Sequence, residues 1–289
     1  MKAIVYEKYG SPDVLKLEEV AKPTPTDDEV LIKVQAVSVN RSDWECLRGK
    51  PLYARIGGLL KPKNQILGSD IAGRVEMAGR NIRRFQPGDE VFGDILERMG
   101  GFAEYVCARG GAMALKPASL TFEQVAAIPQ AAVIALQGIR DKGQVQPGQK
   151  VLINGAGGGA GTFAVQLAKL YGAEVTGVDN TGKLDFMRSL GADHVIDYTR
   201  EDFTKNGQTY DVIFDVAGKS PFSGSIRSLK QNGRYLFGNP NLLQKASGRW
   251  ISRTSSKKVM SWEANQKSED LVFLRELYTQ NTDHRMFLN

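Results

Sequence analysis

Residues 151–179 read VLINGAGGGAGTFAVQLAKLYGAEVTGVD and hold a run of glycines between two apolar segments. The first segment has the composition of a buried strand. The residues after the glycines have helical spacing, and the second apolar segment ends at Asp179. A strand, a glycine turn, a helix and a second strand that ends in an acid about twenty residues later form the dinucleotide-binding fingerprint. A flexible loop is the alternative interpretation, and the flanking elements argue against it.

The glycines follow the register Ala156-x-Gly158-x-x-Gly161, with alanine at the first glycine position. Gly158 lets the backbone approach a pyrophosphate, and Gly161 lets the helix pack closely on the strand. The amide groups at the start of the helix supply an anion site. The predicted cofactor-binding residues here are Ala156, Gly158, Gly159, Ala160 and Gly161, together with Gly238 at the end of the strand-like segment GRYLFG.

The length of 289 residues favours two domains, and 42% hydrophobic with 24% charged residues is typical of a globular protein. The longest apolar candidate, 125–136, contains Pro129 and Gln130, so we expect no membrane partner. Two cysteines and no export signal predict a cytoplasmic protein without a disulfide framework. The net charge of +6 permits an anionic ligand without requiring one.

Two kinds of pattern divide the chain. Period-two segments fill the first part and predict a barrel or sandwich: AIVYEKYG, VLKLEEV, EVLIKVQAVSVN, AGRVEMAG, DEVFGDI and GFAEYVCA. Helical spacing begins in residues 120–143, and from Val151 strands alternate with helices. This alternation predicts a doubly wound parallel sheet, whose sixth and last strand is KKVMSW (257–262). We therefore predict a β-domain at 1–119 and an α/β domain at 120–289.

Several stretches, in the same order along the chain, resemble the medium-chain dehydrogenase/reductase superfamily, in its zinc-free quinone and enone reductase branch. They are AVSVNRSDWECLRG (36–49), LGSDIAGRV (67–75), FQPGDEVFG (85–93), GGFAEYV (100–106), QPGQKVLINGAGGGAG (146–161) and RSLGADHVIDYT (188–199). The resemblance implies a GroES-like β-barrel catalytic domain, followed by a doubly wound, parallel-sheet Rossmann domain. It also implies a cleft between the two.

The zinc enzymes of that superfamily hold their metal with a Cys, a His and a second Cys. By resemblance these positions hold Asn40, Ser69 and a residue near Gln130. The two cysteines and two histidines of the chain are far apart in the sequence, which is not ligand spacing. The sequence therefore predicts a zinc-independent enzyme.

Without a Lewis acid, hydride delivery to a quinone or an α,β-unsaturated carbonyl is easier than alcohol oxidation, because conjugation spreads the developing charge onto an oxygen. Asn40 is the candidate donor to the substrate carbonyl. Tyr53 is either a donor or proton source, or a surface aromatic. Asp43 is expected to orient its loop by capping or by a salt bridge. Water is an alternative source of the final proton.

Two signals conflict over the nicotinamide cofactor. Asp179 ends the second strand, where an acid binds ribose hydroxyls and favours NAD. By resemblance, Lys183 and Tyr198 match the Lys and Tyr that hold the 2′-phosphate of NADPH, and Asn180 stands where a serine is common. Having both in register favours NADP, with NAD as the alternative.

The expected function is zinc-independent reduction of a quinone or enone by NAD(P)H in a homodimer. The alternative is a catalytically impaired or non-catalytic relative with a dinucleotide-binding or structural role, for which RNA is one conceivable ligand. The basic stretch RWISRTSSKK (249–258) offers only Trp250 for stacking, so a nucleic-acid partner is not expected. By resemblance, a segment after LVFLRELYTQ should return to the catalytic domain. The chain reads NTDHRMFLN there, so we expect that domain to lack its return segment.

Overall fold

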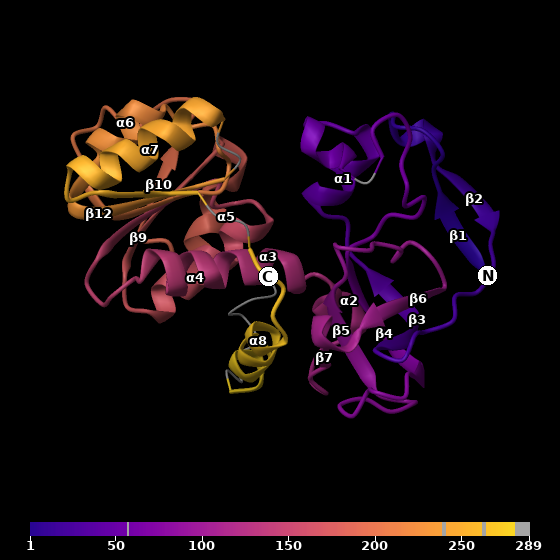
Figure 1. Cartoon of the computed structure of the whole chain (residues 1–289). Helices are drawn as coiled ribbons and strands as arrows, with labels where there is room; N and C mark the ends of the chain where they lie inside the picture. The colour runs from indigo at the N-terminus through magenta and orange to yellow at the C-terminus, as the bar shows by residue number, and fades with distance from the viewer. Residues whose placement is uncertain (57, 239–240, 262–263, 281–289) are drawn as a thin grey trace. The chain divides into compact units, whose positions relative to one another are not determined.

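The computed structural model describes residues 1–56, 58–238, 241–261 and 264–280 (Figure 1). The chain forms two compact units. The first unit is Met1–Gln130 together with a segment that starts at Gln266, and the second unit is built on Ala131–Asn265. No helix of the described residues has both the length and the apolar composition needed to cross a bilayer.

An antiparallel five-stranded sheet forms the centre of the first unit, in the order β6-β3-β4-β5-β7. Its strands are β3 (Glu29–Val37), β4 (Asp70–Ala78), β5 (Glu90–Asp94), β6 (Tyr105–Arg109) and β7 (Met113–Leu115). Alternate residues face a core in which Val30, Ile32, Ile71, Val91 and Met113 are fully buried. The period-two pattern therefore placed its strands correctly, apart from β7, whose three residues are too few to show a period.

This unit also contains a hairpin of β1 (Lys2–Val5) and β2 (Lys16–Glu19), whose two strands are connected through the short 3-10 helix η1 (Pro12–Val14). A second apolar cluster of Tyr6, Leu47, Leu67 and Met99 ties the hairpin to α1 (Arg41–Arg48). Two further 3-10 helices, η2 (Leu52–Arg55) and η3 (Gly110–Ala112), lie in the loops. The cluster fixes α1, which carries Asn40 at its N-terminal boundary.

The helical pattern of 120–143 forms three elements: α2 (Phe122–Ala126), α3 (Pro129–Leu136) and the π-helix η4 (Gln137–Gly143). A new helix begins at Pro129 because proline lacks the amide needed to continue the preceding one. Thr121 and Gln124 form a capping box at the start of α2, and α2 packs on β3 and β4. The first unit consequently extends beyond the predicted boundary at 119 and ends within α3.

The helix α8 (Ser268–Gln280) also belongs to the first unit, although the sequence placed 120–289 in the second domain. Leu271, Leu274 and Tyr278 recur at helical spacing and are buried, and the helix packs against β7. Arg84 Nη1 donates to Ser268 Oγ at 3.0 Å. The last described helix, α8, therefore belongs to the first unit and not to the predicted second domain. Residues 281–289, including NTDHRMFLN, lie outside the described part of the chain.

The second unit holds a six-stranded parallel sheet, which confirms the predicted strand count and direction. Its order is β10-β9-β8-β11-β12-β13. The strands are β8 (Lys150–Asn154), β9 (Glu174–Asp179), β10 (His194–Asp197), β11 (Tyr210–Asp215), β12 (Leu229–Phe237) and β13 (Lys258–Met260). Trp262, at the end of the predicted sixth strand, lies outside the described residues.

The helices of this unit are α4 (Gly159–Leu170), α5 (Leu184–Ser189), which follows the 3-10 helix η5 (Thr181–Lys183), α6 (Phe222–Arg227) and α7 (Leu242–Thr254). In Figure 1, α6 and α7 lie together on one face of the sheet, and α3 and α4 lie on the other. The strand order reverses between β8 and β11. Ligands of open parallel sheets bind at the carboxyl ends of strands beside such a reversal.

Gly161 should be the least replaceable glycine of the turn. A Cβ at this position would lie 2.0 Å from the carbonyl oxygen of Gly155, which belongs to rigid backbone. We expect Gly161→Ala to lower the free energy of unfolding by about 3 kcal/mol. The matched control is Gly159→Ala, whose Cβ would meet nothing closer than 3.8 Å and should change stability by less than about 0.5 kcal/mol. Urea unfolding measures both, and equal effects would contradict the packing role of Gly161.

Candidate functional site

The glycine turn connects β8 to α4 at the carboxyl edge of the parallel sheet. Gly155 has φ +87°, a conformation that favours glycine, whereas Ala156 lies outside the left-handed region. The amides of both residues donate to the carbonyl oxygen of Val178 on β9, at 2.9 and 3.1 Å. Alanine is therefore accepted at 156 because its neighbour Gly155 makes the turn.

The surface of this turn is open to a ligand. A Cβ on Gly158, the N-cap residue of α4, would meet only the Gly155 oxygen at 3.3 Å, and Gly159 is exposed. The first amides of a helix, here those of Gly159, Ala160 and Gly161, lack acceptors within the helix. Donors at a positive helix end, with space above them, fit a pyrophosphate.

Asp179 ends β9, as predicted, and its carboxylate faces the glycine turn. It is 7% exposed. Its Oδ2 accepts a hydrogen bond from the Gly157 amide at 3.0 Å, and its Oδ1 accepts from the amide of Asn180 at 2.8 Å. Asn180 in turn caps η5, where its Oδ1 accepts from the amide of Gly182 at 3.1 Å. The carboxylate thus holds the turn together.

Lys183 and Tyr198 flank the same carboxylate. Lys183 Nζ lies 3.8 Å from Asp179 Oδ2, and the stem of Lys183 covers Gly157. The Tyr198 amide donates to the carbonyl oxygen of Asp179 at 3.1 Å, and the residue is 60% exposed. The structure therefore brings together Asp179, Asn180, Lys183 and Tyr198, which sequence reasoning selected as one adenosine site.

A buried polar network, which sequence reasoning missed, lies at the strand-order reversal. Asp215 ends β11 and is 1% exposed. Its carboxylate accepts hydrogen bonds from Asn154 Nδ2 at 2.8 Å and from the Tyr235 hydroxyl at 3.0 Å, and it also bonds Ser220. Burial and the Asp215 charge raise the pKa of Tyr235, so its phenol stays a donor. The available signal was an acid at the end of the strand DVIFD.

Gly238 lies beside this network. Its amide donates to the carbonyl oxygen of Asp215 at 3.1 Å, and no atom of the described residues would lie closer than 3.8 Å to a Cβ at this position. This predicted residue therefore lies at the same edge of the sheet as Gly158.

In the first unit, residues far apart in sequence form one polar cluster around Asn40. Asn40 Nδ2 donates to Ser69 Oγ at 3.2 Å and to Ser38 Oγ at 3.4 Å. Ser42 Oγ donates to Gln130 Oε1 at 3.0 Å. Asn40 and Ser69, which resemble two of the family's zinc-ligand positions, are thus hydrogen-bonded to each other, and Gln130, near the third position, bonds to Ser42 in the same helix that Asn40 caps.

Asp43 holds this neighbourhood in place. It is 2% exposed, and its two oxygens accept from the amides of Asn40 at 2.7 Å and of Gly68 at 2.9 Å. One carboxylate therefore fixes the start of α1 against the residue before Ser69. This is the orienting role that the sequence suggested for Asp43. Burial raises the pKa of Asp43, and the backbone donors oppose that shift.

Two further acids lie buried beneath the cluster on paired strands. Asp70 on β4 is opposite Asp94 on β5. Asp70 Oδ2 accepts from the Gln130 amide at 2.9 Å. Burial and the charge of Asp94 raise the pKa of Asp70 well above its usual range. Burial also raises the pKa of Asp94 to about 6.

Tyr53, the second candidate catalytic residue, lies in η2 and is 47% exposed. Its hydroxyl donates to Glu45 Oε2 at 2.5 Å, and Glu45 is also paired with Arg41. Burial and the Glu45 carboxylate raise the pKa of Tyr53 to about 12. The Tyr53 hydroxyl therefore already donates its only proton to the Glu45 carboxylate.

Comparison with known proteins shows the family to which the chain belongs. Residues 26–118 match the model described as "Alcohol dehydrogenase GroES-like domain", and 159–252 match "Zinc-binding dehydrogenase". The Spinacia oleracea protein named "Quinone-oxidoreductase homolog, chloroplastic" is 34% identical over 273 residues, which cover 90% of this chain and 81% of that protein. The chain belongs to the medium-chain dehydrogenase/reductase superfamily. Within it, the chain groups with the quinone and enone reductases.

Two other proteins of this superfamily are similar to the chain. The Arabidopsis thaliana "NADPH-dependent alkenal/one oxidoreductase, chloroplastic" is 36% identical over 244 residues, which cover 81% of this chain and 61% of that relative. The structure of the quinone oxidoreductase from Coxiella burnetii matches with a TM-score of 0.86 and 30% identity, over 97% of this chain and 88% of that one. The first unit is accordingly the GroES-like domain, and the second holds the Rossmann sheet.

The described cysteines and histidine lie in three separate elements. Among the described residues, no three His, Cys, Asp or Glu side chains form a group that could hold a metal ion. Cys46 lies in α1 and Cys107 in β6, both as free thiols whose pKa values burial raises. His194 begins β10 and bonds Glu174 at 3.0 Å, while His284 lies outside the described residues.

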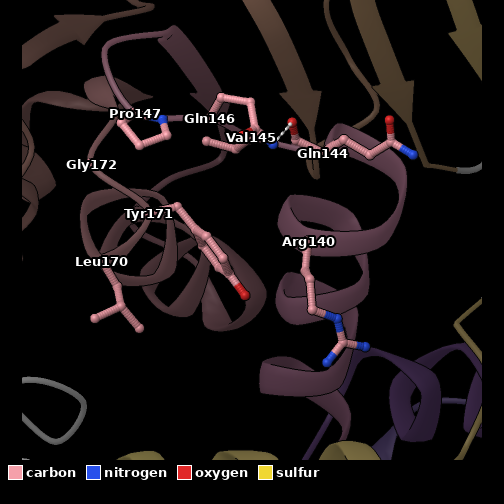
Figure 2. Close-up of a pocket in the computed structure, with 8 residues that line it drawn as sticks. All are labelled: Arg140, Gln144, Val145, Gln146, Pro147, Leu170, Tyr171 and Gly172. Atoms are coloured by element: carbon pink, nitrogen blue, oxygen red, sulfur yellow. Dashed lines mark hydrogen bonds between the residues drawn. The ribbon is translucent and has the colours of Figure 1, made fainter.

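A separate hollow of about 590 Å³ occurs in the Rossmann unit, lined by residues of 140–147 and 170–172 (Figure 2). Figure 2 shows the ring of Tyr171 between α4 and the helix that carries Arg140. Tyr171 follows the last residue of α4, and a helix of this length spans about 18 Å. The hollow therefore lies at the opposite end of α4 from the glycine turn and is not the dinucleotide site.

The buried acids of the GroES-like unit predict a pH-dependent stability. Because the folded state raises the pKa of Asp94 from 3.8 to about 6, the folded protein holds this proton more tightly than the unfolded chain. The contribution of Asp94 to stability should fall as the pH rises between these two values and stay constant above them. Asp94→Asn should remove this dependence, which is worth on the order of 1–3 kcal/mol, and keep an acceptor for the Leu96 amide.

Urea unfolding of the first unit at about pH 4 and about pH 7 measures the difference. The control is Asp185→Asn, at a carboxylate whose side chain is 99% exposed on α5. Parallel pH curves for the parent and Asp94→Asn would contradict the assignment.

Proposed function

We propose that the protein is a zinc-independent oxidoreductase that transfers hydride from NADPH to a quinone or to an α,β-unsaturated carbonyl compound. The observation that carries the proposal is that one chain holds both a glycine turn at the start of α4 and an amide and hydroxyl cluster around Asn40. The names of the spinach and Arabidopsis relatives support the same acceptor classes.

The glycine turn would hold the pyrophosphate through the amides that begin α4. When bound, the nicotinamide supplies the hydride. The residues that would hold the adenosine end are Asp179, Asn180, Lys183 and Tyr198, and Gly238 lies on the same sheet edge. The task left to the GroES-like unit is to orient the acceptor and stabilise the charge that develops on its oxygen.

Asn40 is the residue we propose for that task. Its amide nitrogen makes two long hydrogen bonds, of 3.2 and 3.4 Å, to serine hydroxyls. Long bonds to neutral partners are easily exchanged for a shorter bond to an oxygen that gains negative charge. Asp43 keeps the start of α1 in place during this exchange, because it accepts from the Asn40 backbone amide rather than from its side chain.

Tyr53 is the weaker of the two candidates. Its hydroxyl would have to leave Glu45 before it could donate to a substrate. With a pKa raised to about 12, it is a poor proton source near neutral pH. We therefore propose Tyr53 as a secondary hydrogen-bond donor, and solvent as the source of the final proton.

The proposed activity is tested by following the oxidation of NADPH and NADH with quinones, enones and aldehydes. We expect turnover with conjugated acceptors and little with saturated aldehydes. Prolonged dialysis against a strong chelator should leave the rate unchanged, and a loss of rate that zinc restores would overturn zinc independence. Saturable NADPH binding without turnover of any acceptor would instead favour the non-catalytic alternative.

Asn40→Ser tests the named donor in the same assay. Serine retains a good N-cap residue for α1, so the variant should keep its fold. Loss of a donor to a developing oxyanion should lower kcat about 10²–10³-fold. Tyr53→Phe, the comparison variant, should lower it less than tenfold. The reverse order would transfer the donor role to Tyr53.

The preference for NADPH is proposed from the direction of the charges at the adenosine site. The Asp179 carboxylate accepts from backbone amides of Gly157 and Asn180 and is largely buried. The Lys183 side chain is 41% exposed above it. A carboxylate that faces into the turn and an ammonium group that faces solvent favour binding of the 2′-phosphate of NADPH. NADH would instead need the acid to turn outward, to the ribose hydroxyls.

Lys183→Ala should weaken NADPH binding by about 1–3 kcal/mol, the range for loss of a charge-assisted hydrogen bond. NADH binding should stay nearly unchanged, because NADH has no 2′-phosphate. Fluorescence titration with each cofactor measures the two affinities. The control is Lys205→Ala in the same unit, a lysine that also lies near one acid of its own turn. Equal losses for NADPH and NADH would show that Lys183 only supports the turn, and Asp179 would then select NADH.

Three further expectations accompany the proposal. The acceptor is a small molecule, the protein acts as a homodimer, and it resides in the cytoplasm. The spinach and Arabidopsis relatives are named as chloroplastic. Gel filtration with light scattering tests the dimer directly.

A further inference from the structure

The charge of the chain is unevenly distributed. Residues 216–262 contain nine Lys and Arg and no Asp or Glu. Since the whole chain has a formal net charge of +6, the remaining residues sum to −3. The basic part of the protein is thus one continuous segment, which forms α6, β12, α7 and β13 at one side of the parallel sheet.

Within this segment, α7 presents its cations as a line. Lys245, Arg249 and Arg253 are four residues apart, so they project from one side of the helix, and all three are exposed. None of them forms an ion pair with a described residue. Lys230, by contrast, is paired with Asp211 at 2.7 Å. The three charges are therefore free to meet an external anion.

Large apolar side chains lie beside this line on the same exposed surface. Leu242 is 84% exposed, Leu243 is 79% exposed and Trp250 is 67% exposed. Leu243 and Trp250 are seven residues apart and so share one side of the helix. Exposed apolar groups of this size, gathered on one surface, mark a contact site.

The opposite side of α7 fixes the helix to the sheet. Gly248 is buried against Val259 of β13, where an added Cβ would lie 2.8 Å from Val259 Cγ1. Asn241 and Gln244 form a capping box at the N-terminus of the helix. The leucines, the tryptophan and the cations are therefore presented outward by a helix whose orientation is set by its packing.

We propose that the exposed surface of α7 binds an anionic lipid surface. Such a surface offers phosphate groups to Lys245, Arg249 and Arg253 and an apolar layer to Leu242, Leu243 and Trp250. Surface binding needs no membrane-spanning segment. It therefore revises the expectation of no membrane partner, which rested on the lack of such a segment.

Two other occupants fit less well. A second copy of the chain, placed on α7 by a two-fold axis, would bring two lines of three cations together. A nucleic acid would satisfy the cations, but the two leucines would gain nothing from phosphates, and one tryptophan is a small stacking surface. A lipid surface is the occupant that uses both the cations and the aliphatic side chains.

Co-sedimentation with vesicles tests the proposal. The full chain should bind phosphatidylcholine–phosphatidylglycerol vesicles roughly a hundredfold more tightly than pure phosphatidylcholine vesicles, because each of the three cations contributes near an anionic surface. High salt should weaken this binding. Arg249→Gln/Arg253→Gln and Leu242→Ser/Leu243→Ser should each reduce it at least tenfold. Both variants should keep the circular dichroism of the parent.

The matched control is Leu59→Ser/Leu60→Ser, a pair of adjacent leucines in the first unit that are 65% and 89% exposed. This control should bind vesicles as the parent does. The proposal is overturned if anionic vesicles are not bound, if both α7 variants bind unchanged, or if the control pair loses binding instead. It is equally overturned if the α7 variants lose a dimer seen by light scattering, or lose binding to a homopolymeric RNA while vesicle binding persists.

Discussion

The close contact between Gly161 and the carbonyl oxygen of Gly155 determines the geometry of the second unit. A glycine at 161 allows α4 to start almost directly above the end of β8. That approach places the amides of Gly159 and Ala160 at the carboxyl edge of the sheet, where the strand order reverses. Any larger residue would push the helix away and remove the anion site. The absence of a Cβ at Gly161 thus permits both the close packing of α4 and the position of its first amides.

The electrostatics of the turn depend on this placement. Because α4 begins so close to the sheet, the Gly157 amide reaches the carboxylate of Asp179 across the turn. The acid is then used for structure, and the nearby cation of Lys183 becomes the outward-facing charge. The same residue types in a more open turn would leave the acid free for a ribose. The proposed preference for NADPH therefore depends on how tightly the backbone packs at this turn.

In the first unit, polar groups occupy the positions that resemble the zinc-ligand positions of the family. Asn40, Ser69 and Gln130 are neutral and lie near the buried acids Asp70 and Asp94. Burial raises the pKa values of both acids, and the charge of Asp94 adds to this shift at Asp70. A neutral amide such as that of Asn40 would suit the proposed acceptor, whose oxygen gains charge only during the reaction.

The sequence by itself determined the strands, the glycine turn and the family of this protein, because these depend on local periodicity and on residues adjacent in the chain. It also selected Asp179 as the acid at a strand end, and the family resemblance selected Asn180, Lys183 and Tyr198. Tertiary structure decided what depends on distant contacts. Burial of Leu271, Leu274 and Tyr278 packs α8 on the first unit. The Tyr53 hydroxyl donates to Glu45, and the Tyr235 hydroxyl donates to the buried carboxylate of Asp215. No local sequence pattern predicts these contacts, because burial and hydrogen-bond partners depend on segments far away in the chain.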